Sequence, residues 1–458
     1  MPICGTESQM PSHRRSSQSL SVLSPAKAAA SRSEPSSSRR AKSPHDLHPA
    51  CVVLGRVGAR RDCFEGDFTT SAVSHTSMGD EISVSFELVE PPEASLLVLD
   101  WPQGPGPMES TLSYPHVLSS HGNAVLFEVS SRAKRPSAPI DYFVYAASSE
   151  PSKQSSLSRL PACYWKGNSS ADPPRPRILN RKATGILSLS ERPFSFQVIE
   201  LERAADSPSN MNMYMFWSEP NKWKVFKGIQ VYHCRGGSDM YWWSTDAVVP
   251  RCGNHLVWID YYRGMIIGTM RGTVREPCLE YVAFPIHPVQ GNPEDSDHGR
   301  GCPETSRNVC VTRNHLIKFI CVNQHSSGFS ITMWCWAATH QKWREEVTMD
   351  ASQFWALDPE NRLPHVLPEF PVIDLMDGNT VCFLLNKGRH ALDLAAPTWI
   401  VQVDMKDQRL LGATPYSREE RLSCQRPFLT ARRMSMGHSL ICSDMPSYML
   451  RKLTKARG

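Results

Sequence analysis

Short runs in which apolar and polar residues alternate make up most of this chain. Residues 82–88 alternate strictly, as in a strand with one buried face, and residues 95–101 form a nearly continuous apolar run that Pro102 ends. Similar short runs recur between positions 184 and 405, separated by Gly, Pro, Asn and Asp. No segment keeps an apolar period of 3.6 residues over three turns. The pattern therefore predicts an all-β protein made of short antiparallel strands.

The clearest hairpin signal lies in the middle of the chain. Two β-rich runs, residues 256–260 and 265–270, are joined by the polar link Tyr-Tyr-Arg-Gly at 261–264. We expect a tight turn in this link, with Gly264 supplying a positive φ angle.

Three polar side chains on this predicted turn are candidates for recognition. Asp260, Tyr261 and Arg263 would lie at the tip of a hairpin, where a rigid β-scaffold often presents its binding residues. The alternative is structural, because Asp260 and Arg263 can fix the turn by hydrogen bonds or an ion pair. Both interpretations remain open at this point.

An aromatic strand, a polar turn and a Lys-Trp pair occur twice, at residues 215–223 and 333–343, with a looser relative at 398–408. Four-stranded units arranged radially form a β-propeller, with ~40–50 residues in each blade. Residues 49–445 would supply roughly six to eight such blades. The sequence thus favours a propeller-like array of short antiparallel strands, with packed β-sandwiches as the alternative.

The ends of the chain differ from its body. Residues 1–48 hold 13 Ser, 7 Lys and Arg and 3 Asp and Glu, which is typical of a disordered leader. An organelle transit peptide, or a short nuclear address at 39–42, are the alternatives. We expect an N-terminal β-rich portion over 49–165 and a continuous β-domain over 166–445, with a Pro-rich connector at 172–176. A basic tail follows at 446–458.

The net charge of +5 belongs to these ends, because residues 49–445 carry 39 basic and 42 acidic residues. A near-neutral body argues against nucleic-acid binding there and leaves the basic tails as a weaker alternative. The 14 Cys include no C-x-x-C pair, and no secretory signal or membrane-spanning apolar run is present. We therefore expect reduced thiols, no membrane partner, and an intracellular location in cytoplasm or nucleus, with an organelle as the alternative.

A family resemblance rests on the hairpin region. The run LVWIDYYRGMI at 256–266 is followed by LEYVAFP at 279–285, and FPV, VCF and VQVD follow at 370–372, 381–383 and 401–404. Together these segments resemble a plant family expanded in cereal grasses, domain of unknown function 1618, over about residues 160–445. The resemblance implies a β-rich, propeller-like fold, distantly similar to kelch and F-box-associated β-domains. It implies no activity, cofactor or catalytic residue.

The sequence predicts no metal or cofactor site. The loop at 295–299 has Gly299 at the third acidic position of a calcium loop and lacks a closing Glu. Zinc ligands usually come as closely spaced pairs, whereas the Cys and His residues of the 298–325 region are irregularly spaced. These residues are Cys302, Cys310, Cys321, His298, His315 and His325.

We therefore expect a non-enzymatic interaction module that binds a protein partner through loops at one end of the β-array. The alternative is a carbohydrate-active or other hydrolase in the same fold. It would require carboxylates, such as Asp260 and Asp374, to converge in one pocket with shifted pKa values.

Overall fold

The computed structural model describes most of the chain beyond residue 48, and all described residues belong to one compact unit, Pro44–Gly458. The predicted leader, residues 1–48, lies outside them. The described ranges are 49–64, 70–105, 113–132, 138–148, 154–165, 175–191, 194–205, 207, 209–232, 238–251, 253–270, 276–286, 301–386, 398–416 and 440–449.

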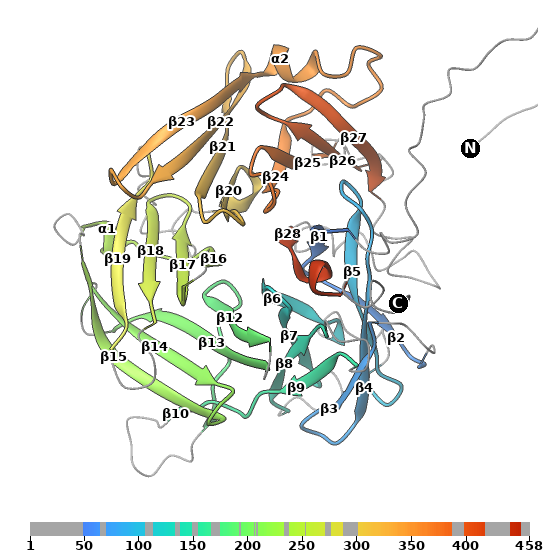
Figure 1. Ribbon diagram of the computed structural model, residues 1–458, viewed down its shortest axis with the longest axis vertical. Helices are drawn as coiled ribbons and strands as arrows, with labels where there is room; N and C mark the ends of the chain where they lie inside the picture. Colours follow the sequence, from blue (N-terminus) through green and yellow to red (C-terminus); the bar gives the residue numbers. More distant parts are fainter. Residues whose placement is uncertain are drawn as a thin grey trace, which may run out of the picture. The chain divides into compact units, whose positions relative to one another are not determined.

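Four-stranded antiparallel units dominate this part of the chain, as Figure 1 shows. Three sheets are single units, formed by strands β6–β9, β20–β23 and β24–β27. Their strands are β6 (His116–His121), β7 (Ala124–Ser130), β8 (Ile140–Ala146), β9 (Ser156–Arg159), β20 (Arg307–Val311), β21 (Ile317–His325), β22 (Gly328–Ala337), β23 (Lys342–Asp350), β24 (Pro368–Ile373), β25 (Thr380–Asn386), β26 (Thr398–Asp404) and β27 (Arg409–Tyr416).

An eight-stranded sheet contains two further units, β12–β15 and β16–β19, which are joined where β15 and β19 pair in parallel. Its strands are β12 (Thr184–Glu191), β13 (Phe194–Arg203), β14 (Asn210–Trp217), β15 (Lys222–Tyr232), β16 (Ala247–Arg251), β17 (His255–Asp260), β18 (Gly264–Thr269) and β19 (Cys278–Ala283). A small sheet pairs β10 (Tyr164–Trp165) with β11 (Arg175–Pro176). The short helical segments are α1 (Ser238–Tyr241), α2 (Ala351–Trp355) and the 3-10 turns η2 (Pro303–Thr305) and η5 (Met445–Tyr448).

The remaining sheet combines both ends of the described chain. Its strand order is β28-β1-β5-β4-β3, and β2 also pairs with β5. The C-terminal β28 runs antiparallel to β1, whereas β1 and β5 are parallel. These strands are β1 (Val52–Gly55), β2 (Ala59–Arg61), β3 (Ala72–His75), β4 (Glu81–Glu87), β5 (Ala94–Asp100) and β28 (Leu440–Ser443).

Buried hydrophobic clusters join each unit to the next one along the chain. Such clusters lie between β1–β5 and β6–β9, and then at every following junction as far as β20–β23 and β24–β27. A sixth cluster packs β24–β26 against β1, β5 and β28, which closes the ring of sheets. Inner strands such as β5 and β7 are buried along their whole length because sheets cover both faces. The prediction of an all-β, propeller-like array is confirmed.

Two features differ from the prediction: the role of Gly264 in the hairpin turn and the structure at the start of the basic tail. The turn at 261–264 joins β17 and β18 as expected, but Gly264 does not have a positive φ angle. A Cβ atom there would lie 2.3 Å from the Val282 carbonyl oxygen, so glycine permits a close approach to β19. At the other end, η5 covers the start of the predicted basic tail, and its first residue, Met445, and the following Met449 are buried in the core. The basic residues beyond 449 lie outside the described ranges.

Candidate functional site: the central cavity

A cavity of about 490 Å³ lies where the inner strands of the sheets meet. Its wall is formed by β6, β16, β20, β24 and β28, together with segments that precede or follow them. Its ionisable residues are Arg56, His116, His121, Arg181, Lys182, Asp246, Tyr261, Cys302, Glu304, Cys310, Arg313, His315, Cys442, Asp444 and Tyr448. Because the residues that line the cavity come from five sheets, the cavity exists only when the ring is closed.

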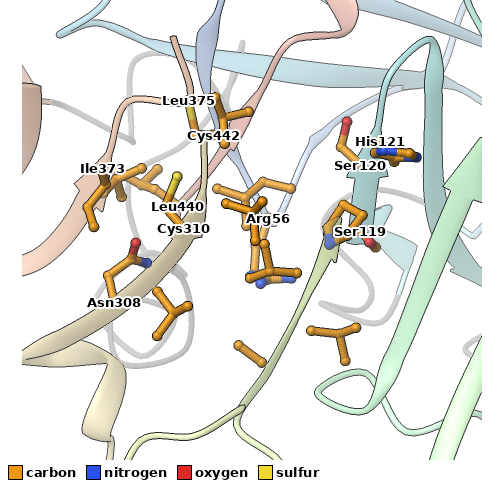
Figure 2. Close-up of a pocket in the computed structure, with 18 of the residues that line it drawn as sticks. Arg56, Ser119, Ser120, His121, Asn308, Cys310, Ile373, Leu375, Leu440 and Cys442 are labelled. Carbon is orange, nitrogen blue, oxygen red and sulfur yellow. The ribbon is translucent and has the colours of Figure 1, made fainter. Parts of the chain in front are cut away.

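Arg56 occupies a central position in this cavity. Figure 2 shows it between the strand carrying Asn308 and Cys310 and the strand carrying Ser119. Its guanidinium Nη1 donates to the backbone carbonyl oxygen of Leu118, at 2.8 Å. Burial lowers the pKa of Arg56, and the nearby carboxylate of Glu304 acts in the opposite direction. Among the described residues, no carboxylate lies within ion-pairing distance of Arg56, so its charge is available to a ligand.

Lys182 forms ion pairs with two acidic residues of the wall, Glu304 and Asp246. Its Nζ lies 2.9 Å from Glu304 Oε1 and 3.9 Å from Asp246 Oδ1. Burial opposes ionisation of Glu304, but the charge and hydrogen bond of Lys182 outweigh it and lower the pKa of Glu304. Asp246 also accepts a hydrogen bond from the Tyr261 backbone N–H, at 2.9 Å. Both carboxylates are therefore engaged in structural contacts.

The thiols in the cavity are held in the protonated form. Burial and the neighbouring Glu304 raise the pKa of Cys302 to about 11. Burial likewise raises the pKa of Cys310 and of Cys442 well above the usual value. A nucleophilic cysteine needs the opposite shift, because the thiolate is the reactive species.

His121 is also held neutral. Its Nδ1 accepts a hydrogen bond from the Ser188 backbone N–H, at 3.0 Å, which leaves the ring proton on Nε2 of the neutral imidazole. Burial lowers the pKa of His121, although the carboxylate of Asp444 acts against this shift. His121 thus presents no positive charge near neutral pH.

A strained residue lies on the cavity wall. Phe370 has a φ of 49°, a backbone conformation that residues with bulky side chains rarely adopt. It lies at an irregularity of β24, where the register shifts between Glu369 and Val372. Strained backbone of this kind occurs frequently at ligand-binding positions.

The three predicted recognition residues do not form an exposed tip. Asp260, Tyr261 and Arg263 are all buried, with exposed fractions of 0%, 2% and 6%. Arg263 Nη1 lies 3.2 Å from Asp260 Oδ2, and the same carboxylate accepts the N–H groups of Ser244 and Tyr262. The structure thus corrects the expectation of a surface contact, because these side chains satisfy the turn itself. Tyr261 alone also lines the cavity.

The carboxylates that a hydrolase would need do not meet in the cavity, and the candidate metal ligands do not form a site among the described residues. Neither Asp260 nor Asp374 lines the cavity, and Asp374 accepts a hydrogen bond from the Met376 N–H in its own turn. No group of three or more His, Cys, Asp and Glu among the described residues could hold a metal ion. The calcium-like loop at 295–299 lies outside the described ranges.

The sequence pattern did not indicate the charged residues that line this cavity. Arg56, Lys182, Asp246 and Glu304 stand in unrelated turns and carry no motif or regular spacing. Of the residues that the sequence analysis singled out, this wall includes Tyr261 of the predicted turn and Cys302, Cys310 and His315 of the irregular group of Cys and His residues.

Comparisons with known proteins agree with the family resemblance. Residues 258–382 match the family described as "Protein of unknown function (DUF1618)". This segment runs from within β17 to within β25, and it confirms the predicted resemblance. The plant and cereal distribution stays a prediction. No curated protein matches the chain.

Solved structures show distant likeness. The β-propeller domain of Vanderwaltozyma polyspora Nup133 is 10% identical over 67% of this chain and 75% of that chain, with a TM-score of 0.31. The tricorn protease is 9% identical, over 74% of this chain and 28% of that chain, with a TM-score of 0.26. An α-L-arabinanase from Penicillium chrysogenum is 11% identical over 73% of this chain and 92% of that chain, with a TM-score of 0.25. Likeness at this level carries no argument about function.

None of the helices in the described ranges has both the length and the apolar character needed to cross a membrane.

Proposed function

We propose that this chain is a non-enzymatic interaction module that binds a protein partner at the central cavity, with an acidic side chain of the partner reaching Arg56. One observation carries the proposal: Arg56 lines the cavity, backbone carbonyl oxygens hold its guanidinium, and no carboxylate of the described residues forms an ion pair with it. A guanidinium held by backbone carbonyls is well suited to bind a carboxylate, because its remaining N–H groups keep a fixed geometry.

A hydrolase in the same cavity is the alternative function. Glycoside hydrolysis commonly needs one carboxyl group kept protonated and a second one ionised. Glu304 and Asp246 are instead both drawn to Lys182, and the pKa of Glu304 is lowered. Together with the protonated thiols, this arrangement favours binding over acid–base or nucleophilic chemistry.

Affinity capture and proximity labelling in the native cell test the proposal. The variant Arg56→Met removes the charge but keeps the aliphatic stem, and Arg56→Lys keeps a charge without the planar fork. Arg409→Met is the matched control, since the Arg409 side chain is 65% exposed on β27. We expect the partners of the wild type and of Arg409→Met to be lost with Arg56→Met and partly retained with Arg56→Lys.

Two results would contradict this function. An unchanged set of partners in a folded Arg56→Met variant would separate binding from the cavity. Turnover of a glycoside or ester by the purified chain, abolished by Glu304→Gln, would support the hydrolase instead. The weaker nucleic-acid alternative involves residues 1–48 and the basic tail at 446–458. The leader and all the basic residues of the tail lie outside the described ranges, and this alternative stays a prediction together with the intracellular location.

A further inference from the structure

Two cysteines from opposite ends of the chain meet where the ring of sheets closes. Cys51 directly precedes β1, and Cys442 lies within β28, opposite Val53 in the antiparallel pair. Their Sγ atoms are 2.7 Å apart although 391 positions separate them in the sequence. Both residues are reduced in this structure. The strand pairing therefore places two thiols within reach of a covalent bond.

The neighbouring thiols do not compete for this contact. Cys310 on β20 and Cys382 on β25 lie near enough to influence the same electrostatic environment. Among the described residues, however, no other pair of sulfur atoms comes within hydrogen-bonding distance. The contact between Cys51 and Cys442 is thus specific to the β1–β28 pairing.

A small oxidant has a route to this pair. Cys51 is buried, but Cys442 lies on the wall of the central cavity, as Figure 2 shows. Burial and the adjacent Cys51 keep Cys442 protonated, so the exchange is expected to be slow near neutral pH and faster in alkaline solution.

We propose that Cys51 and Cys442 form a disulfide that closes the ring of sheets covalently. The oxidant is a low-molecular-weight disulfide such as oxidised glutathione. One cysteine loses its proton and attacks a glutathione sulfur, which breaks the glutathione S–S bond and releases one glutathione thiol. The second cysteine then displaces the other glutathione from the mixed disulfide. The protein loses two S–H groups and gains one S–S bond, and one oxidised glutathione becomes two reduced molecules.

The position of the bond predicts a large effect on unfolding. Antiparallel β1–β28 pairing joins the two ends through four register pairs, and the cluster that includes Val53 and Leu440 packs beside it. A cross-link that encloses nearly the whole body restricts the unfolded chain, because the entropy of loop closure grows with loop length. We expect the oxidised chain to unfold about 5 °C above the reduced chain. This inference does not depend on the proposed function.

The test uses the full chain, oxidised with glutathione disulfide at pH 8 and then alkylated with iodoacetamide. Peptide mass spectrometry should identify the Cys51 peptide linked to the Cys442 peptide, and the oxidised chain should migrate faster on a non-reducing gel. Cys51→Ser and Cys442→Ser should each abolish the linked peptide and the thermal shift. Cys310→Ser, which changes another buried thiol of the cavity, should keep both.

Comparison of oxidised and reduced wild type needs no variant, so it remains decisive if a substitution impairs folding. The proposal is overturned if Cys51 and Cys442 are both still free after oxidation and are therefore alkylated by iodoacetamide. It is also overturned if Cys442 is found linked to Cys310 or Cys382 instead, or if the linked chain unfolds at the same temperature as the reduced one.

Discussion

The β12–β15 and β20–β23 units use the same device to join the preceding sheet, but they support it differently. In each unit a Lys-Trp pair begins the fourth strand. Trp223 pairs with Phe216 and donates its indole N–H to the Pro161 carbonyl, at 2.8 Å. Trp343 pairs with Trp336 and donates to the Ala283 carbonyl, also at 2.8 Å. Both acceptors follow or end the fourth strand of the preceding unit.

The surroundings of the two tryptophans are unequal. The Trp343 ring lies near Phe284, Phe319 and Trp336, with centroid distances of 5.7, 6.1 and 5.3 Å. The Trp223 ring has one aromatic neighbour in the described structure, Phe216 at 5.4 Å. One sequence signal therefore marks the same hydrogen bond at two junctions, while the packing energy depends on which aromatic residues the neighbouring sheet supplies.

The two units also differ in the polarity of a buried position on their second strands, β13 and β21. The register places Ile199 of β13 and Lys318 of β21 at equivalent positions. Ile199 is fully buried in a hydrophobic cluster, whereas the buried Lys318 forms an ion pair with Glu346. The second unit thus tolerates a buried charge because its own fourth strand supplies a partner.

Removing the better-packed indole should have the largest effect. Trp343→Ala deletes the hydrogen bond and three aromatic contacts, so we expect a loss of about 3 kcal/mol in the free energy of unfolding. Urea denaturation followed by circular dichroism measures this loss. A change below that of Trp223→Ala would contradict the comparison.

The same deletion in the other unit should cost less. Trp223→Ala removes one aromatic contact and one hydrogen bond, and we expect a loss of about 2 kcal/mol under identical conditions. Equal losses at both sites would mean that the hydrogen bond, and not the aromatic packing, sets the strength of these junctions.

Phenylalanine separates the two contributions. Trp343→Phe and Trp223→Phe keep a ring but remove the indole N–H, so each should lower the free energy of unfolding by about 1 kcal/mol. We expect the two values to agree because the two hydrogen bonds are equivalent. A clearly larger value for Trp343→Phe would show that packing of the larger indole ring contributes there as well.

The ion pair of the β20–β23 unit should produce the smallest, pH-dependent effect. Burial opposes ionisation of Glu346, but hydrogen bonds from Lys318 and Arg344 outweigh it and lower the pKa of Glu346 below its ordinary value. A carboxylate with a lowered folded-state pKa stabilises the protein above its unfolded pKa, and this stabilisation disappears as the pH falls through the folded-state pKa.

We therefore expect Glu346→Gln to destabilise the chain near pH 7, and the difference from wild type to shrink below about pH 4. Glu345→Gln is the matched control, since Glu345 is the adjacent carboxylate on the same strand and is exposed. Urea denaturation at several pH values gives the comparison. A difference that does not depend on pH would rule out the ion pair as its source.

The sequence by itself determined the strands, the β17–β18 hairpin and the recurrence of Lys-Trp at the start of a strand. These features are local: alternation of apolar residues and the chemistry of a turn act over a few neighbouring positions. For the same reason, the ion pair that fixes the turn at Asp260 and Arg263 was already among the alternatives. The burial of these residues was not predicted, because the Asp246 loop and the β19 strand that cover them are separate segments of the sequence.

Only the tertiary structure decided the central cavity and the closure of the ring. Arg56, Lys182 and Glu304 face one cavity because the inner strands of six units converge, although more than 100 positions separate each from the next. Cys51 and Cys442 meet because the C-terminal strand returns to pair with β1. No local pattern encodes such contacts, since they follow from how many units close the ring and in which register its first and last strands pair.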